Sequence, residues 1–209
     1  EEFLNKYMPQ TMATLPESAW KETLINGKIY MVPRNTAEIF PDRGPFVNMD
    51  IAEKYGFTAD DIKTYDDFKE LLLAIGDKES GNGMYAYYQS STSNFQELGW
   101  RYRFNLINNQ ASDNVYYCQL DDPNFENPFF LYTSEYWKTY IQDMAEFAAA
   151  GCWPSDAISN TNAITTLFEN GQSATSRGNY YNGITMIKGY RDKGMNVELF
   201  DIFPEVSGG

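Results

Sequence analysis

The stretch Asn26-Gly27-Lys28-Ile29-Tyr30-Met31-Val32-Pro33 decides the fold more than any other part of this chain. Asn-Gly is a strong turn-forming pair, an apolar run follows it, and a proline ends the run. This order of residues predicts a loop, a brief buried strand over 28–33, and a break where the chain changes direction.

Segments on both sides give this stretch its context. Leu15-Pro16-Glu17-Ser18-Ala19-Trp20 precedes it, and Asp50-Ile51-Ala52-Glu53-Lys54-Tyr55-Gly56-Phe57 follows it. Further along, Thr64-Tyr65-Asp66-Asp67-Phe68 has the pattern of a helix start, and Leu167-Phe168-Glu169-Asn170-Gly171-Gln172-Ser173-Ala174 that of a passage from helix to strand. A last apolar segment runs from Val197 to Pro204.

In their order and spacing these segments resemble the extracellular solute-binding proteins of ABC importers, the maltose-binding-protein-like group that captures sugars. In that family the strand with the pattern N-G-K-I-Y-x-V-P leads from the first lobe through the hinge into the second. The segment from Thr64 resembles the family's T-W-D-E-F helix start, and the segment from Leu167 resembles its F-x-x-G-x-A-A passage. The resemblance implies one periplasmic-binding-protein-like type II lobe, with a mixed sheet flanked by helices.

The same resemblance predicts how the chain is organised. Residues 1–33 are expected to be the tail of the first lobe and the hinge strand, residues 34–204 the second α/β lobe, and residues 205–209 the return to the hinge. The chain is therefore expected to be a fragment of a two-lobed protein.

Periodicity along the chain independently predicts an α/β fold, because helices alternate with strands. The expected helices cover 46–55, 66–75, 93–107, 134–150, 162–170 and 181–192, and the expected further strands cover 84–89, 115–119, 172–176 and 196–202.

Two of these helices carry an apolar stripe that should face the core. Thr64 is a suitable N-cap for the helix over 66–75. The expected stripes are Phe68, Leu71, Leu72 and Ile75 on the helix over 66–75, and Trp137, Ile141, Met144 and Ala148 on the helix over 134–150.

The composition excludes several classes of protein. A net charge of −13 argues against a nucleic-acid partner, which needs a concentrated basic surface. No apolar run approaches the roughly 20 residues of a membrane span. The chain has no histidine and only two cysteines, Cys118 and Cys152, so triads that need histidine and a Cys₄ zinc site are excluded. Whether the two cysteines are bridged is left open by their spacing.

Acidic pairs are the remaining candidates for catalysis. Asp60-Asp61, Asp66-Asp67 and Asp121-Asp122 could each suggest the two acids of a glycosidase. Adjacent residues on a helix or strand point in different directions, so these pairs fit a solvated surface better than a facing catalytic pair. The sequence therefore favours a protein without catalytic residues, metal or cofactor.

Polar residues that follow strand ends are the candidate ligand contacts, because ligands of open α/β sheets bind outside the carboxyl ends of strands. Three segments qualify, after Pro33, after Tyr88 and after Ser176. The resemblance implies a polar or acidic hinge residue after Pro33, and it places a ligand-stacking aromatic after Ser176, where this chain has tyrosine in place of tryptophan. The expected ligand-binding residues are Asn35, Glu38, Gln89, Ser91, Arg177, Asn179 and Tyr180.

The resemblance implies that the protein captures a small-molecule ligand, a mono- or oligosaccharide, for ABC permease subunits in a bacterial membrane. The high aromatic content, 16%, suits the apolar faces of sugar rings. The resemblance implies an extracellular protein, lipid-anchored or periplasmic, and we expect a monomer. A glycosidase-type carbohydrate-active enzyme and a lectin-like binding module remain the alternatives.

Overall fold

The structure is a computed structural model, and the chain divides into two compact units, Glu1–Phe40 and Pro41–Gly209. The residues that it describes are 2–33, 44–88, 101–102, 105–106, 116–118, 126–177 and 180–202. No helix in these ranges is both long and apolar enough to cross a membrane.

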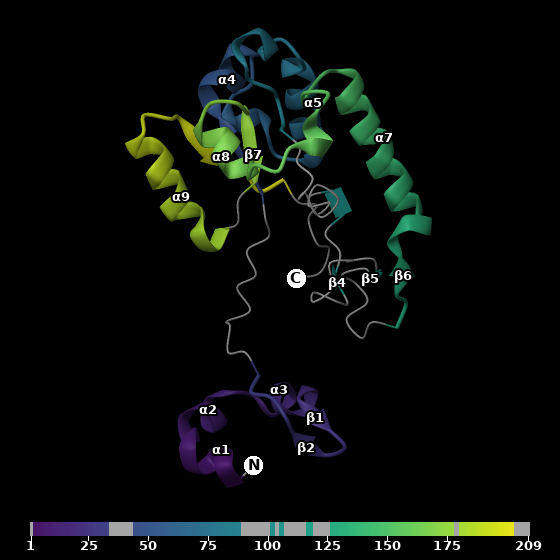
Figure 1. Ribbon diagram of the computed structural model, residues 1–209, viewed down its shortest axis with the longest axis vertical. Helices are drawn as coiled ribbons and strands as arrows, with labels where there is room; N and C mark the ends of the chain where they lie inside the picture. The colour runs from purple at the N-terminus through teal and green to yellow at the C-terminus, as the bar shows by residue number, and fades with distance from the viewer. Residues whose placement is uncertain are drawn as a thin grey trace. The chain divides into compact units, whose positions relative to one another are not determined.

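The smaller unit consists of three short helices and one hairpin (Figure 1). Its elements are α1 (Glu2–Tyr7), α2 (Pro9–Thr14), α3 (Glu17–Glu22), β1 (Leu24–Ile25) and β2 (Lys28–Ile29).

The buried strand expected over 28–33 is wrong, because the Asn-Gly pair closes a hairpin instead. Asn26 and Gly27 have φ angles of 52° and 75°, as in the type I′ turn that joins two antiparallel strands. Ile25 pairs with Lys28 across this turn, and the strand ends at Ile29. The residues beyond are exposed, with Tyr30 66% accessible. A type I′ turn pairs the strand before it with the strand after it. The apolar run after the turn does not by itself show this pairing.

The larger unit holds the central sheet of the molecule. Its elements up to the long helix are β3 (Pro45–Asn48), α4 (Met49–Lys54), η1 (Ala59–Asp61), α5 (Tyr65–Ile75), η2 (Ser80–Asn82), β4 (Asn105–Leu106), β5 (Tyr116–Cys118), β6 (Phe129–Phe130) and η3 (Leu131–Thr133). They are followed by α7 (Glu135–Ala149), η4 (Ala157–Ser159), α8 (Ile164–Glu169), β7 (Thr175–Arg177), α9 (Tyr180–Asp192) and β8 (Val197–Leu199).

The sheet has the order β7-β3-β8, and β3 is antiparallel to both neighbours. A helix was expected to begin at Phe46, and this expectation is wrong at its start, because residues 45–48 form β3 and α4 begins only at Met49. Pairing with two segments late in the chain makes 45–48 a strand. Asn48 then caps α4 by accepting a hydrogen bond of 3.1 Å from the Asp50 backbone N–H.

Alternate residues of β3 face two different cores. Val47 belongs to the core that α4, α5 and α7 share, whereas Phe46 packs with Phe168 of α8 and Tyr190 of α9. The ring centroids of Phe46 and Tyr190 are 5.4 Å apart. In Figure 1, α8 and α9 accordingly lie on the other side of β7 from α5 and α7. The predicted α/β class is thus confirmed, with helices on both faces of the sheet.

Helix α5 begins and packs as its sequence predicts. The Thr64 hydroxyl accepts a hydrogen bond from the Asp67 N–H, and the Asp67 carboxylate accepts one from the Thr64 N–H, at 3.2 and 2.8 Å. Hydrogen bonds from the Lys63 backbone and from Thr64 lower the pKa of Asp67. The expected apolar stripe is fully buried, with Leu71 and Ile75 at 0% exposure.

Helix α7 is present as predicted, but its buried face differs from the expected stripe. The buried residues are Tyr140, Asp143 and Phe147, while Ile141 is 45% exposed. Of the expected stripe, Trp137 and Met144 are half-buried and pack against the cores, whereas Ile141 and Ala148 are exposed, so the stripe is wrong at those two positions. The pattern of apolar residues did not predict the buried face of α7, because a charged residue, Asp143, lies in the middle of that face.

Asp143 is 4% exposed and accepts hydrogen bonds from three side chains. Lys69 donates at 2.8 Å, Arg101 at 2.7 Å and the Tyr65 hydroxyl at 3.1 Å. Lys69 also lies 2.6 Å from Glu146. Burial lowers the pKa of Lys69, but the hydrogen bonds to Asp143 and Glu146 outweigh it and leave the pKa raised. This charged cluster joins α5 to α7.

A second antiparallel sheet of the larger unit has the order β4-β5-β6 and includes the strand expected over 115–119. Tyr117 of β5 stacks on Phe129 of β6, with ring centroids 6.2 Å apart. Cys118 and Cys152 are both buried thiols and are not bridged to each other. Burial raises the pKa of Cys152 to about 12, so this thiol is a structural, uncharged group.

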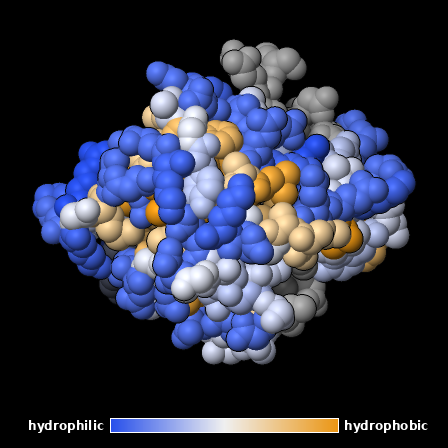
Figure 2. Space-filling model, turned by 90° about the horizontal axis from the view of Figure 1, so that it is seen from above, coloured by the Kyte–Doolittle hydropathy of each residue, from blue (hydrophilic) through white to orange (hydrophobic). Residues whose placement is uncertain are grey.

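The surface seen in Figure 2 is mostly hydrophilic, with small and separated apolar patches. This agrees with a net charge of −13 and a mean hydropathy of −0.52.

Candidate functional site

The strands of the central sheet bring three segments to one end of it. Arg177 is the last residue of β7 and lies opposite Pro45, the first residue of β3. The Phe200 backbone N–H, just after β8, donates to the Pro45 carbonyl at 3.0 Å. The chain therefore leaves the sheet after Arg177 and after Phe200 at the same end at which it enters β3. We call this the Arg177 end.

A further segment runs parallel to the residues at the start of β7. Tyr85 forms a parallel bridge with Ser173, and the Ala174 N–H donates to the Tyr85 carbonyl at 2.8 Å. A strand was expected over 84–89, but the regular pairing stops after Ala86. There the Thr175 hydroxyl donates to the Ala86 carbonyl at 2.8 Å, and the Tyr87 N–H donates to Cys152 and not to β7.

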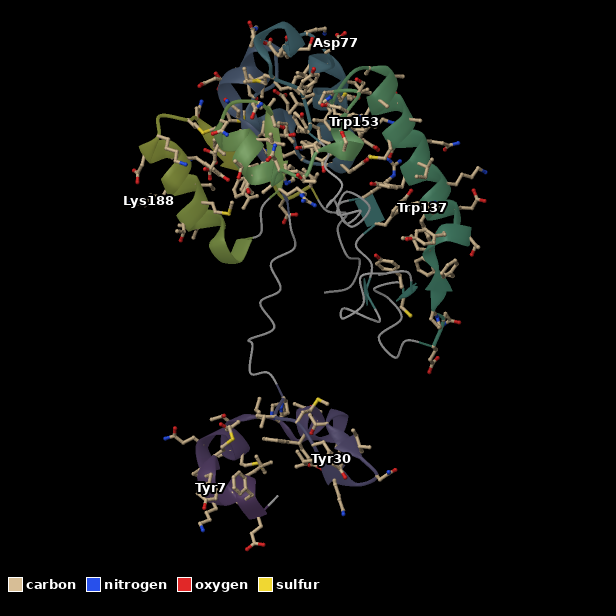
Figure 3. All side chains as sticks on the ribbon, in the orientation of Figure 1. Tyr7, Tyr30, Asp77, Trp137, Trp153 and Lys188 are labelled. Carbon is tan, nitrogen blue, oxygen red and sulfur yellow. The ribbon has the colours of Figure 1, made fainter. Side chains whose placement is uncertain are left out.

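Tyr87 fixes this segment in the core of the larger unit. Its side chain is fully buried, and its N–H donates to the Cys152 carbonyl at 3.0 Å. Its ring packs edge-on against Trp153, 6.5 Å away between centroids, and Trp153 in turn packs against Phe147 of α7. Trp153 is labelled in Figure 3. Tyr88 is thereby held on a rigid support beside Ser173, just before the start of β7.

Tyr88 is half-buried and presents both an aromatic ring and a hydroxyl. Its N–H donates to the Ser173 hydroxyl at 3.2 Å, and its ring lies edge-on to Tyr85 at 5.8 Å. Burial raises the pKa of Tyr88, and the nearby Asp156 and Tyr85 raise it further. The phenol is therefore protonated near neutral pH and can donate a hydrogen bond. The sequence did not single this residue out, and its only signal is that it ends an aromatic run.

Arg177 is also half-buried, and its Nη1 atom is shielded from solvent. No described residue accepts a hydrogen bond from this atom. An ionised group in such a position is costly unless something compensates its charge. Arg177 therefore offers charged hydrogen-bond donors at the Arg177 end.

Of the expected ligand-binding residues, the structure describes both the backbone and the side chain of Arg177. Tyr180 is the first residue of α9, but its side chain is not described. Asn35, Glu38, Gln89, Ser91 and Asn179 lie outside the described residues. Their roles stay predictions. Within the described ranges there is no group of three or more His, Cys, Asp or Glu that could hold a metal ion.

Comparison with known proteins adds the family. A sequence model of the family described as bacterial extracellular solute-binding protein matches residues 4–208. The chain belongs to this family. No curated protein sequence matches the chain significantly.

Solved structures show the fold of this solute-binding protein. An N-glycan transport solute-binding protein from Streptococcus pneumoniae is similar over 97% of this chain and 42% of its own, with a TM-score of 0.65 and 17% identity. An ABC substrate-binding protein from Listeria monocytogenes, solved with cycloalternan, is similar over 94% of this chain and 46% of its own, with a TM-score of 0.56 and 18% identity. The GacH receptor of Streptomyces glaucescens, solved with and without acarbose, is similar over 94% of this chain and 45% of its own, with a TM-score of 0.52 and 16% identity.

At these identities the likeness shows the fold, and it confirms the expected periplasmic-binding-protein-like architecture. The chain spans less than half the length of each of these structures.

Proposed function

We propose that this chain is part of a protein that captures a mono- or oligosaccharide outside a bacterial cell and delivers it to ABC permease subunits without altering it. The observation that carries the proposal is the Arg177 end, where the half-buried Arg177 lies beside the start of β3 and the residues that follow β8. Sugars are recognised by aromatic faces with polar groups at the rim, and Arg177 supplies one such polar group. The similar structures from S. pneumoniae and L. monocytogenes, solved with Man5GlcNAc and with cycloalternan, support a sugar as the ligand class.

We also propose the lobe assignment: residues 1–33 as the tail of the first lobe and hinge strand, 34–204 as the second lobe, and 205–209 as the return to the hinge. The surface of the smaller unit supports it. Only Leu15, Trp20 and Thr23 of its described residues are buried. The large apolar side chains that it exposes are Phe3, Tyr7, Leu24, Ile25, Tyr30, Met31 and Val32.

Such a surface is typical of a piece that packs against further protein. In the full-length protein we expect the backbone amides of α1 to α3 to be protected from hydrogen exchange by the rest of the first lobe. Exchange as fast as in an isolated peptide would contradict the assignment.

Site assignment follows from the same proposal. Arg177 contacts the ligand directly, and Asn35, Glu38, Gln89, Ser91, Asn179 and Tyr180 line the remainder of the cleft. Each replaced singly by alanine should weaken sugar binding in the full-length protein while leaving its unfolding temperature without sugar nearly unchanged.

Thermal unfolding of the full-length protein across a panel of sugars and short oligosaccharides tests the function. A ligand at a hundred times its dissociation constant stabilises the native state by about 2.7 kcal/mol, which shifts the melting temperature visibly. A saturable shift with one sugar family, and recovery of that sugar intact, is the expected result. Conversion of the sugar would instead support the glycosidase alternative.

A lectin-like module predicts equal affinity in a protein from which the first lobe is deleted. No shift with any sugar would contradict capture of sugars and leave the family assignment standing. Membrane fractionation of the native protein tests the lipid anchor, which predicts its recovery with the membrane, and sedimentation tests the expected monomer.

A further inference from the structure

Arg177 differs from the other described arginines in having no acidic partner among the residues that the structure describes. Arg101 lies 2.7 Å from Asp143, and Arg191 lies 2.6 Å from Glu198. No described carboxylate lies within ion-pair distance of Arg177, and its shielded Nη1 atom has no described acceptor. In a chain of net charge −13, a guanidinium without a counter-charge among the described residues needs a physical explanation.

The cost of this arrangement depends on what covers the guanidinium. An ionised group that loses its water is destabilising unless an opposite charge and hydrogen bonds replace the water. When a ligand closes over Arg177, neutral hydroxyl groups supply hydrogen bonds but no opposite charge. A carboxylate supplies both, because its two oxygens match the fork of N–H groups that a guanidinium presents.

The excess of acidic residues in the chain disfavours unspecific binding of anions, so an anion held at this end of the sheet needs a specific contact such as Arg177.

We propose that the ligand is an acidic sugar, whose carboxylate pairs with the guanidinium of Arg177. This inference rests on the proposed function and adds the chemical class of the substrate. The other source of the same chemistry is an aspartate or glutamate of the protein itself that meets Arg177 on closure, and the experiment separates the two.

The experiment compares matched sugars by isothermal titration calorimetry with the full-length protein. The pairs are glucose and glucuronate, galactose and galacturonate, galactobiose and digalacturonate, and N-acetyllactosamine and its sialylated form. We expect at least one acidic member to bind at least tenfold more tightly than its neutral partner, with an affinity that falls as salt is added. Arg177→Gln should abolish this preference, and Arg177→Lys should retain part of it.

Arg191→Gln is the matched control. Arg191 of α9 is already paired with Glu198 of β8, so its replacement should leave the preference unchanged. Melting curves without ligand identify a variant that fails to fold, and Arg177→Lys then carries the test.

Several results would overturn the proposal. If neutral sugars bind as tightly as acidic ones or more tightly, the ligand is neutral, while the proposed capture of sugars stands. If Arg177→Gln weakens neutral and acidic sugars equally, the guanidinium pairs with an acid of the protein or with hydroxyl groups. If no sugar of either kind binds, the proposed function fails together with this inference.

Discussion

Replacement of Asp143 by alanine is the sharpest test of what stabilises the larger unit. The carboxylate is 4% exposed and compensates Lys69 at 2.8 Å and Arg101 at 2.7 Å. Removing one partner of a buried ion pair costs about 3–5 kcal/mol, because the remaining charge is left without compensation. Lys69 and Arg101 keep 20% and 25% of their side-chain exposure, and Lys69 keeps Glu146 at 2.6 Å. We therefore expect the lower end of this range, about 3 kcal/mol.

Glu146→Gln is the matched control. Glu146 binds the same ammonium group as Asp143, but its side chain is 51% exposed, so its loss should cost less than about 1 kcal/mol. Urea unfolding followed by circular dichroism measures both variants, and with a slope of about 2 kcal/mol per molar the midpoint of Asp143→Ala should fall by about 1.5 M. The reasoning is that burial of the carboxylate, and not the ion pair as such, sets the loss of unfolding free energy. Equal urea midpoints for the two variants would refute it.

Three further predictions concern local structure. Thr64→Ala should destabilise the larger unit by about 1 kcal/mol in urea unfolding, because it removes the cap of α5. Gly151→Ala should be clearly more destabilising than Gly171→Ala. Both residues have φ near +70°, so alanine strains the backbone equally at the two positions. A Cβ at Gly151 would also lie 2.7 Å from the Cβ of Asp77, whereas a Cβ at Gly171 would face open space. Equal melting temperatures of these two variants would contradict the steric argument. Hydrogen bonds, above all that from Lys54, lower the pKa of Glu79 below its ordinary value of 4.5, so its stabilisation is present above pH 4.5 and is lost as the pH falls through the lowered pKa. The stability difference between the native protein and Glu79→Gln should accordingly shrink below pH 4.5, and a difference independent of pH would argue against it.

Signals contained within a few residues predicted the structure well. The capping box of Thr64 and Asp67 and the stripe that includes Phe68 and Leu72 gave the position and the buried face of α5 correctly. The family could also be inferred from the sequence, because the order of short local segments along the chain is itself a sequence property.

Predictions failed where a partner far along the chain decides the outcome. Residues 45–48 form a strand because Thr175–Arg177 and Val197–Leu199 pair with them, which a local reading of apolar residues cannot show. The buried face of α7 includes Asp143, because Lys69 and Arg101 compensate the charge of this carboxylate in the core.

The candidate site shows the same division. The sequence by itself determined that polar residues follow the strand ends, and it named Arg177 among them. Only the tertiary structure decided that Arg177 lies opposite Pro45, beside the residues that follow β8, and that it is half-buried without a described counter-charge. The physical reason is that hydrogen bonding, burial and charge compensation at this end depend on strands brought together from distant parts of the chain, whereas turns and caps depend on neighbouring residues.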